Sequence, residues 1–125
     1  IYTMVDTLSL HDALPIPGSD PKSNGDRVPT VTERRLCRPW LDAELALVQP
    51  EVILPVGRLA INLFYPPKLK LVELIGDHKV DEQGRIIVPL PHPSGASRWF
   101  NEPRNVARLD LALYRLKLLK EQLAL

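Results

Sequence analysis

Residues 86–101 read IIVPLPHPSGASRWFN, an apolar run followed by a polar stretch rich in proline. The β-branched start at residues 86–88 predicts a buried strand. Proline fixes φ, lacks an N–H donor and biases the preceding residue toward extended geometry, so the Pro-His-Pro at 91–93 should be stiff. A stiff polar segment after a buried strand is where α/β proteins place their chemistry. An ordinary surface turn is the alternative, and composition alone favours it.

The segment that follows, from about Pro103 to the C-terminus, has the pattern of a long amphipathic helix. Its predicted apolar face consists of Leu109, Ala112, Leu113, Leu116, Leu119 and Leu123. Arg108, Asp110 and Arg115 lie largely elsewhere on the helix. We expect Asn101 to cap this helix, with Pro103 in its first turn, because both residue types are favoured at these positions.

A second apolar run, EVILPVG, occupies residues 51–57. It is short and rich in β-branched residues, which predicts a strand buried on both faces. Gly57 begins a helical segment over residues 58–64, which Pro66 and Pro67 end. Strand, glycine and helix form a βα unit. A glycine at such a turn lets a ligand or another backbone approach closely, although tight βα turns use glycine for geometry alone.

Two short elements are expected between these regions. Residues 68–75 predict a short helix that ends at Gly76. Residues 77–81 and 84–88 flank a turn at 82–84, the pattern of a β-hairpin. Helices that alternate with buried strands predict an α/β fold, with three α/β/α layers and a mostly parallel central sheet.

A longer helix is expected over residues 30–48. Thr30 and Glu33 fit a capping box at its start. Its predicted apolar face consists of Leu36, Trp40, Ala43 or Glu44, and Leu47, widened by Leu41, Leu45 and Val48. Pro39 lies inside this pattern and predicts a kink or a break near residues 37–38.

Residues 1–16, IYTMVDTLSLHDALPI, resemble a translated sequencing-library adapter, with residues 4–6 where a variable index would stand. They lack the basic start and continuous apolar run of a secretory signal. We therefore exclude them from the fold prediction as non-native. Residues 17–125 are taken as the domain, truncated at its N-terminus. A short genuine helix is the alternative, to which the weak periodicity of residues 4–14 gives little support.

The composition is that of one soluble globular domain. The chain has 125 residues, of which 45% are hydrophobic and 25% charged, and its net charge is +1. No apolar run is long enough to span a bilayer, so we expect no membrane association. The single cysteine, Cys37, excludes an internal disulfide and makes a reducing, cytoplasmic setting the default. We expect a monomer.

Several classes of site are excluded by spacing. Cys37, His78 and His92 are too far apart in the sequence for a recognisable metal-ligand motif. No glycine pattern matches a dinucleotide fingerprint or a P-loop. A serine hydrolase needs a base beside its nucleophile. Ser94 is only two residues from His92, and their side chains should not converge.

The ordered motifs of the chain resemble a known family. They are CRPWL at 37–41, Glu44-Leu45, PEVILPVGRLA at 50–60, Gly76, and HPSGAS at 92–97, preceded by NGDRVP at 24–29. This series resembles the C-terminal part of the uracil-DNA glycosylase superfamily. The similarity is closest to the branch with the iron–sulfur, thermostable-type enzymes, and it covers most of residues 24–101.

The resemblance implies base-excision repair of DNA, by hydrolysis of the N-glycosidic bond of a flipped uracil. His92 would be the catalytic hydrogen-bond donor to the base. The implied DNA-binding residues are Ser94, Gly95, Ala96, Ser97, Arg98 and Trp99. Of these, Ser94 and Ser97 would hold phosphates, as could Arg98 and Arg104. Either Trp99 or Phe100 would be the wedge in the minor groove, unless these rings anchor the loop to the core.

Two features of the family are missing from this sequence. Its first motif, which activates water and reads the base, would lie upstream of residue 17, so we expect this stretch alone to be inactive. Cys37 matches the position of a cluster ligand, but an iron–sulfur cluster needs four thiolates and the chain has one. Cys37 is then an orphaned ligand or a plain thiol. A non-catalytic nucleic-acid-binding module and a plain α/β interaction domain remain the alternative functions.

Overall fold

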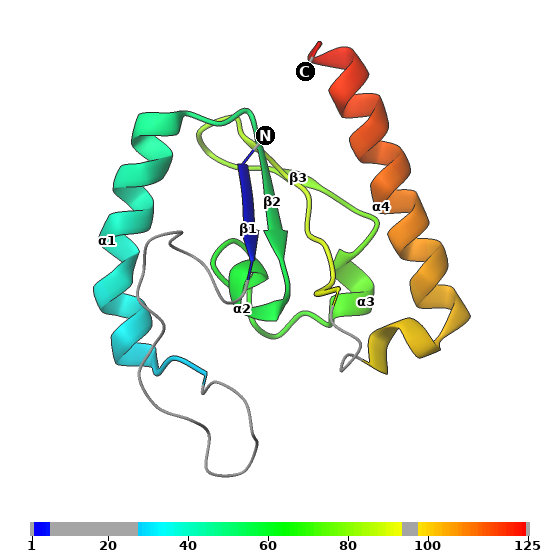
Figure 1. Cartoon of the computed structure of the whole chain (residues 1–125), viewed down its shortest axis with the longest axis horizontal. Helices are drawn as coiled ribbons and strands as arrows, with labels where there is room; N and C mark the ends of the chain where they lie inside the picture. Colours follow the sequence, from blue (N-terminus) through cyan, green and yellow to red (C-terminus); the bar gives the residue numbers. More distant parts are fainter. Residues whose placement is uncertain (1, 6–27, 94–97, 125) are drawn as a thin grey trace. The chain divides into compact units, whose positions relative to one another are not determined.

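A computed structural model describes residues 2–5, 28–93 and 98–124 of the chain. These residues fall into two compact parts, which we call the sheet unit (residues 2–5, 50–93 and 98–124) and the helix unit (residues 28–49). The elements of the sheet unit (Figure 1) are β1 Tyr2–Val5, β2 Val52–Val56, α2 Arg58–Ile61, α3 Leu71–Leu74, β3 Lys79–Val80, β4 Ile86–Ile87, the 3₁₀-helix η1 Arg98–Asn101 and α4 Pro103–Gln122. The helix unit contains α1 Val31–Val48.

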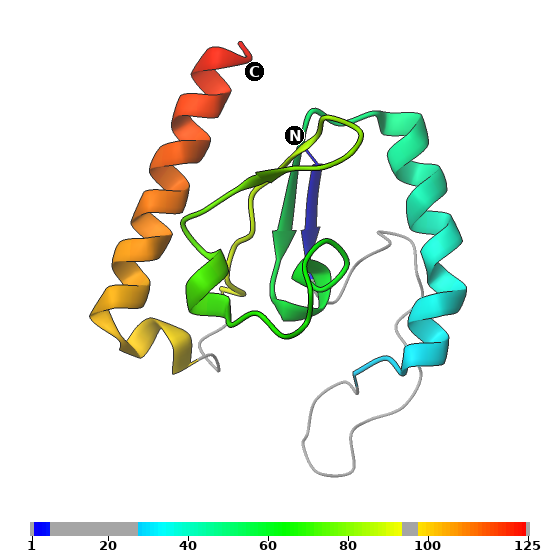
Figure 2. The same ribbon diagram turned by 180° about the vertical axis from the view of Figure 1, so that it is seen from behind.

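The strands form a four-stranded sheet in the order β1-β2-β4-β3. β2 is parallel to β1 on one side and to β4 on the other, whereas β3 is antiparallel to β4. Both views show β1 and β2 side by side and pointing the same way (Figures 1 and 2). The α/β class is confirmed, and the described sheet is mixed.

Strand β2 is the central, buried strand that its apolar sequence predicts. Val52, Ile53, Pro55 and Val56 are all buried. Pro55 is unusual there, because a proline cannot donate to a sheet ladder. Its carbonyl still accepts from the Leu90 N–H at 3.0 Å, and the pairing of β2 with the chain after β4 therefore continues past it.

The core of the sheet unit brings α2, α3 and α4 together. One buried cluster, which we call the core cluster, consists of Ile61, Leu74, Ile75 and Ala112, and Tyr65, Leu71, Leu90 and Trp99 pack against it. Each fully buried aliphatic side chain contributes about 1.5–3 kcal/mol of transfer free energy. The predicted face of α4 is thus right at Ala112, whereas Leu113 is 49% exposed and lies outside it.

The turn after α3 is fitted closely to α4. Gly76 has φ +91°, and a Cβ there would lie 3.1 Å from the carbonyl oxygen of Arg108. The Arg115 guanidinium contacts the Asp77 carboxylate at 3.1 Å, and Arg108 donates to the Ile75 carbonyl at 3.3 Å. Both arginines therefore have structural partners, and the glycine is required by backbone conformation and close approach.

Helix α1 begins with the predicted capping box. The Thr30 N–H donates to the Glu33 carboxylate at 2.7 Å, and the Glu33 N–H donates to the Thr30 hydroxyl at 3.2 Å. The helix runs through Pro39 to Val48, so of the predicted kink or break, the break is wrong. Proline removes only one hydrogen bond from the ladder, and the rest of an 18-residue helix holds it.

The predicted apolar face of α1 is right only in part. Leu41 and Leu45 are buried at 2% and 4% exposure. Leu36, Trp40 and Leu47 are 69%, 69% and 86% exposed. Periodicity indicates the helix correctly, but the predicted face is wider than the buried one, and the sequence alone does not show which part of it is buried.

Other predictions are corrected in detail. The helix expected over 58–64 is the four-residue α2 followed by hydrogen-bonded turns, and that expected over 68–75 is α3 alone. The hairpin around residues 82–84 is confirmed. Asn101 does not cap α4, because it belongs to η1 and Glu102 occupies the cap position.

One strand of the sheet lies in the segment excluded from the fold prediction. Residues 2–5 form strand β1, so a prediction that excludes residues 1–16 omits this strand. Many sequences can add a strand at a sheet edge, and the strand therefore carries no information about the origin of this segment.

Within the described residues, none of the helices has the length and apolarity to cross a membrane.

Candidate functional site

His92 lies just beyond the carboxyl ends of two neighbouring parallel strands, β2 and β4. The chain after β4 keeps its parallel pairing as far as Leu90, which is bridged to Val56. Ligand sites of open α/β sheets lie at such carboxyl ends, because the loops that leave them converge. The position expected for His92 from its sequence context is therefore the one observed.

Residues 86–93, the incoming arm of the His92 segment, are held by backbone hydrogen bonds. The Val88 N–H donates to the Ile53 carbonyl at 2.9 Å, and the Leu90 N–H to the Pro55 carbonyl at 3.0 Å. Pro89 and Pro91 are buried, so their fixed φ angles lie within the packed unit. The predicted stiffness of this arm has a clear structural basis.

Gly57 joins the βα turn to this arm. Its N–H donates to the Leu90 carbonyl at 2.9 Å, two residues before His92. Its φ of 87° and ψ of 165° fall in a region that is essentially restricted to glycine. The structure thus brings together the Gly57 turn and the His92 segment, which the sequence suggests as two separate features.

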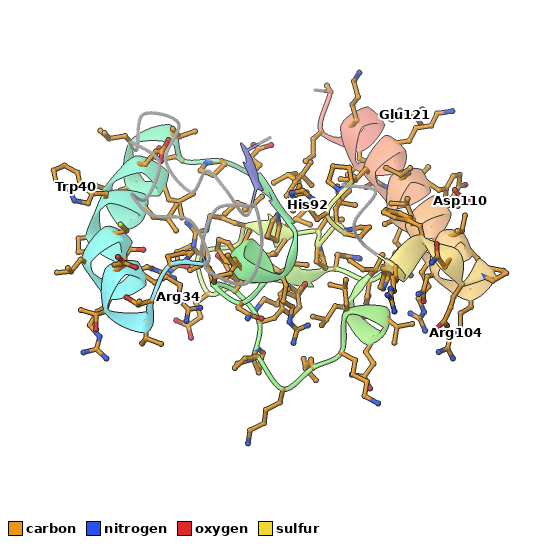
Figure 3. The ribbon with its side chains drawn as sticks, turned by 60° about the horizontal axis from the view of Figure 1, so that its bottom comes forward. Arg34, Trp40, His92, Arg104, Asp110 and Glu121 are labelled. Carbon is orange, nitrogen blue, oxygen red and sulfur yellow. The ribbon has the colours of Figure 1, made fainter. Side chains whose placement is uncertain are left out.

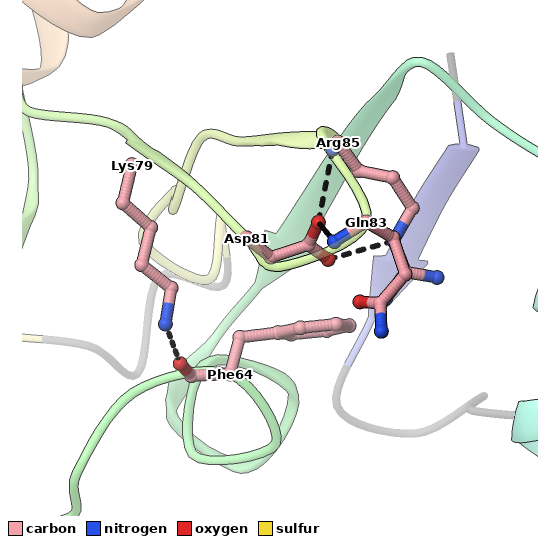
Figure 4. Close-up of polar contacts among 5 residues, drawn as sticks. All are labelled: Phe64, Lys79, Asp81, Gln83 and Arg85. Atoms are coloured by element: carbon pink, nitrogen blue, oxygen red, sulfur yellow. Dashed lines mark hydrogen bonds and ion pairs between the residues drawn. The ribbon is translucent and has the colours of Figure 1, made fainter.

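The hairpin before β4 is closed by Asp81. Its carboxylate accepts from the Arg85 side chain at 2.7 Å and from the backbone N–H groups of Arg85 and Gln83 at 2.9 and 3.0 Å (Figure 4). Burial alone would raise the pKa of Asp81, but these hydrogen bonds outweigh it and hold the pKa below its usual value. The turn that leads into β4 is therefore fixed by a charged pair.

Tyr65, in the α2–α3 connection, and Lys79, on β3, support β4. The Tyr65 hydroxyl donates to the Ile87 carbonyl at 3.3 Å, and the Lys79 ammonium lies 4.4 Å from the centre of the Tyr65 ring. Lys79 also donates to the Phe64 carbonyl (Figure 4). Burial, with a smaller effect from the negative charge of Asp77, raises the pKa of Tyr65 to about 12. These contacts are structural.

Residues 98–101, the outgoing arm, are held mainly by side chains. Trp99 is half-buried, packs against the core cluster and meets the Phe100 ring edge-on at 5.4 Å. Asn105, only 5% exposed, donates from Nδ2 to the Trp99 carbonyl at 2.7 Å. Sequence reasoning missed Asn105. The available signal was an amide in the first turn of a helix next to the aromatic pair.

The other predicted site residues differ in exposure and in whether the structure describes them. His92 is half-buried and Arg98 is exposed. Arg104 is exposed, pairs with Glu102 at 2.7 Å and lies well apart from His92 (Figure 3). Ser94, Gly95, Ala96 and Ser97 lie outside the described residues.

Comparison with known proteins decides the family. The model of the uracil DNA glycosylase superfamily matches residues 3–117. The chain belongs to this superfamily. A Type-4 uracil-DNA glycosylase of Thermotoga maritima is 28% identical over 88 residues, which cover 69% of this chain and 46% of that protein. The chain thus spans about half the length of this relative, and the predicted resemblance, including its thermostable-type branch, is confirmed.

An iron–sulfur cluster does not fit the residues of this glycosylase-superfamily chain. Cys37 is exposed on α1 and is the only cysteine in the sequence. Among residues 2–5, 28–93 and 98–124, no three histidine, cysteine or acidic side chains are grouped closely enough to hold a metal ion. Four thiolates are required, so no step of the chemistry is assigned to a cluster here.

Proposed function

We propose that the protein of which this chain is a part is a uracil-DNA glycosylase that hydrolyses the N-glycosidic bond of a flipped uracil. The observation that carries the proposal is the superfamily match over residues 3–117, which includes the His92 segment. The position of His92 beyond the parallel strands β2 and β4 supports it, because active sites of α/β sheets lie there.

His92 has the chemistry that this reaction needs. Cleavage of the bond leaves negative charge on the departing base and oxocarbenium character on the sugar. A hydrogen-bond donor held near a carbonyl oxygen of the base stabilises that charge more in the transition state than in the ground state. In comparable sites one such donor contributes about 3–4 kcal/mol. The stiff incoming arm supplies the preorganisation on which this contribution depends.

The residues after His92 are proposed to hold the DNA strand. Ser94 and Ser97 would bind phosphates, with Gly95 and Ala96 between them and Arg98 beside them. Such contacts position the strand without reading its sequence. The packing of Trp99 against the core supports an anchoring role for its ring in preference to that of a wedge.

The activity requires sequence beyond this chain. The water-activating residue and the base-reading pocket belong to the family's first motif, which we place upstream of residue 17. With that sequence present, we propose a three-layer α/β/α domain. Any iron–sulfur cluster of the longer protein would need thiolates from outside residues 1–125, with Cys37 as one candidate ligand.

Uracil excision by the longer protein tests this proposal. Uracil release from a DNA duplex is measured for the wild type, for His92→Ala and for His78→Ala, an exposed histidine near β3 that serves as the control. Loss of about 3–4 kcal/mol of transition-state stabilisation predicts that the rate of uracil release falls by two to three orders of magnitude in His92→Ala and is unchanged in His78→Ala.

The outcomes separate the possible functions. An unchanged excision rate in His92→Ala would remove His92 from the mechanism. Salt-dependent binding to abasic DNA without any excision by the longer protein would favour the non-catalytic binding module. Neither binding nor excision would favour the plain interaction domain.

A further inference from the structure

We infer that Asn105 is a positioning residue that fixes the backbone of Trp99 and thereby places Arg98 for contact with a DNA phosphate. The inference deepens the proposed function and rests on it. Asn105 lies in the first turn of α4, outside the segment that carries the family motif. Its role would be to act through Arg98 without touching the DNA.

The first argument is the contact itself. Asn105 Nδ2 donates to the Trp99 carbonyl at 2.7 Å, and the Asn105 N–H donates to the Glu102 carbonyl at 2.9 Å. Asn105 therefore joins the two ends of the turn between η1 and α4. With the Trp99 ring packed on the core cluster, both the side chain and the carbonyl of Trp99 are fixed.

The second argument is what this contact does for Arg98. Arg98 is the first residue of η1 and is exposed, so its guanidinium is accessible to a phosphate. Its Cα is joined to that of Trp99 through one peptide unit. The fixed side chain and carbonyl of Trp99 also set the position of its backbone nitrogen, which belongs to the peptide that joins it to Arg98. Because both residues lie in η1, the 3₁₀ geometry then restricts where the Arg98 side chain begins. A cation whose backbone is already fixed loses less entropy when it binds an anion.

The third argument is that asparagine is not the best choice for stability alone. Asn105 is 5% exposed, and its Oδ1 atom is buried without a hydrogen-bond partner among the described atoms. A buried acceptor without a partner is destabilising, and a leucine, which has the same branched shape, would avoid this loss. The asparagine is therefore better explained by the placement of Trp99 than by packing.

The test is binding of the 125-residue chain to a short DNA duplex with one abasic site, measured over a range of salt concentrations. Asn105→Leu keeps the branched shape and the number of non-hydrogen atoms of the side chain and removes the donor. Asn62→Leu is the matched control, because Asn62 also has a buried Oδ1 without a partner among the described atoms and has no described contact with Trp99. Thermal unfolding of each variant is measured in parallel.

We expect Asn105→Leu to bind DNA about tenfold more weakly. The slope of log K against log salt concentration should be smaller in magnitude by about one, as for loss of a single phosphate contact. Its melting temperature should stay close to that of the wild type, because loss of the hydrogen bond to the Trp99 carbonyl and removal of the unpaired Oδ1 atom have opposite effects on stability. Asn62→Leu should bind like the wild type. In an Arg98→Ala background, Asn105→Leu should have no further effect on binding, because the two residues act through the same contact.

Three results would overturn the inference. If Asn105→Leu binds with the affinity and salt dependence of the wild type, the hydrogen bond from Asn105 does not position any group that binds DNA. Additive effects of Asn105→Leu and Arg98→Ala would show that Asn105 does not act through Arg98, whatever its effect on stability. If the wild-type chain shows no salt-dependent binding, this chain does not bind DNA by itself, and the inference is wrong. The first two results leave the proposed function intact.

Discussion

The two arms of the His92 segment are held in different ways. The incoming arm, residues 86–93, is paired with β2 through backbone hydrogen bonds that reach Leu90 and Gly57. The outgoing arm, residues 98–101, depends on the Trp99 ring and on the amide of Asn105. Backbone pairing tolerates many side chains, whereas packing and amide contacts depend on particular ones. The first arm therefore resists substitution, and the second is sensitive to it.

The largest effect on stability is expected in the outgoing arm. Trp99→Ala should destabilise the chain by about 2–3 kcal/mol, somewhat less than for a fully buried tryptophan, because Trp99 is half-buried. Chemical denaturation monitored by circular dichroism measures this change. Phe100→Ala is the control and should have a smaller effect, since Phe100 does not belong to the core cluster.

The same pair of variants distinguishes an anchor from a wedge. If Trp99 acts only as a wedge in DNA, Trp99→Ala will leave the free energy of unfolding unchanged and will weaken binding to abasic DNA. An unfolding free energy equal to that of the wild type would therefore contradict the anchoring role.

A smaller effect is expected where the incoming arm meets the βα turn. Gly57→Ala should cost about 1–3 kcal/mol, because φ 87° and ψ 165° are strained for any residue with a Cβ. Gly84→Ala is the matched control, because Gly84 also has positive φ but lies on an open hairpin turn, where an added Cβ would have no atom within 4 Å. A Gly57→Ala protein no less stable than Gly84→Ala would show that the turn at Gly57 is not tightly constrained.

The smallest effect is expected at the hairpin that precedes β4. Asp81→Asn should cost about 1–2 kcal/mol at neutral pH, because charged hydrogen bonds to Arg85 become neutral ones. The folded-state pKa of Asp81 lies below the value of about 3.9 for an unfolded aspartate. Its contribution is therefore present above that pH and is lost as the pH falls through the folded-state pKa.

Denaturation curves measured from about pH 7 down to about pH 2 check this prediction. The difference between the wild type and Asp81→Asn should shrink steadily as the pH falls below about 4. A difference that stays constant with pH would mean that the charge of Asp81 does not contribute.

The predictability of the two arms differs for the same physical reason. The incoming arm follows from local sequence, since β-branched residues predict the strand and prolines predict the stiffness. The contact between Asn105 and Trp99 depends on how η1 turns into α4, and no periodic pattern reports that turn. The sequence accordingly predicts Asn101 at the cap position that Glu102 occupies.

The long helices teach a related lesson. Helix α4 presents its predicted residue Ala112 to the core, whereas α1 buries Leu41 but exposes Trp40, although both belong to its predicted face. Helical spacing identifies a helix, but the buried face depends on what the rest of the fold offers to it. Strand β1 is absent from the prediction because a resemblance to an adapter says nothing about whether residues 2–5 can pair with a sheet edge.

The claim at the centre of this account is that the backbone of β2 and β4 holds the segment that carries His92. Amide hydrogen exchange of the 125-residue chain, followed by NMR, tests it most directly. The N–H groups of Gly57 and Leu90 should exchange only on near-global opening, far more slowly than that of Asn105 in the first turn of α4. Exchange of Gly57 and Leu90 as fast as that of Asn105 would contradict the claim.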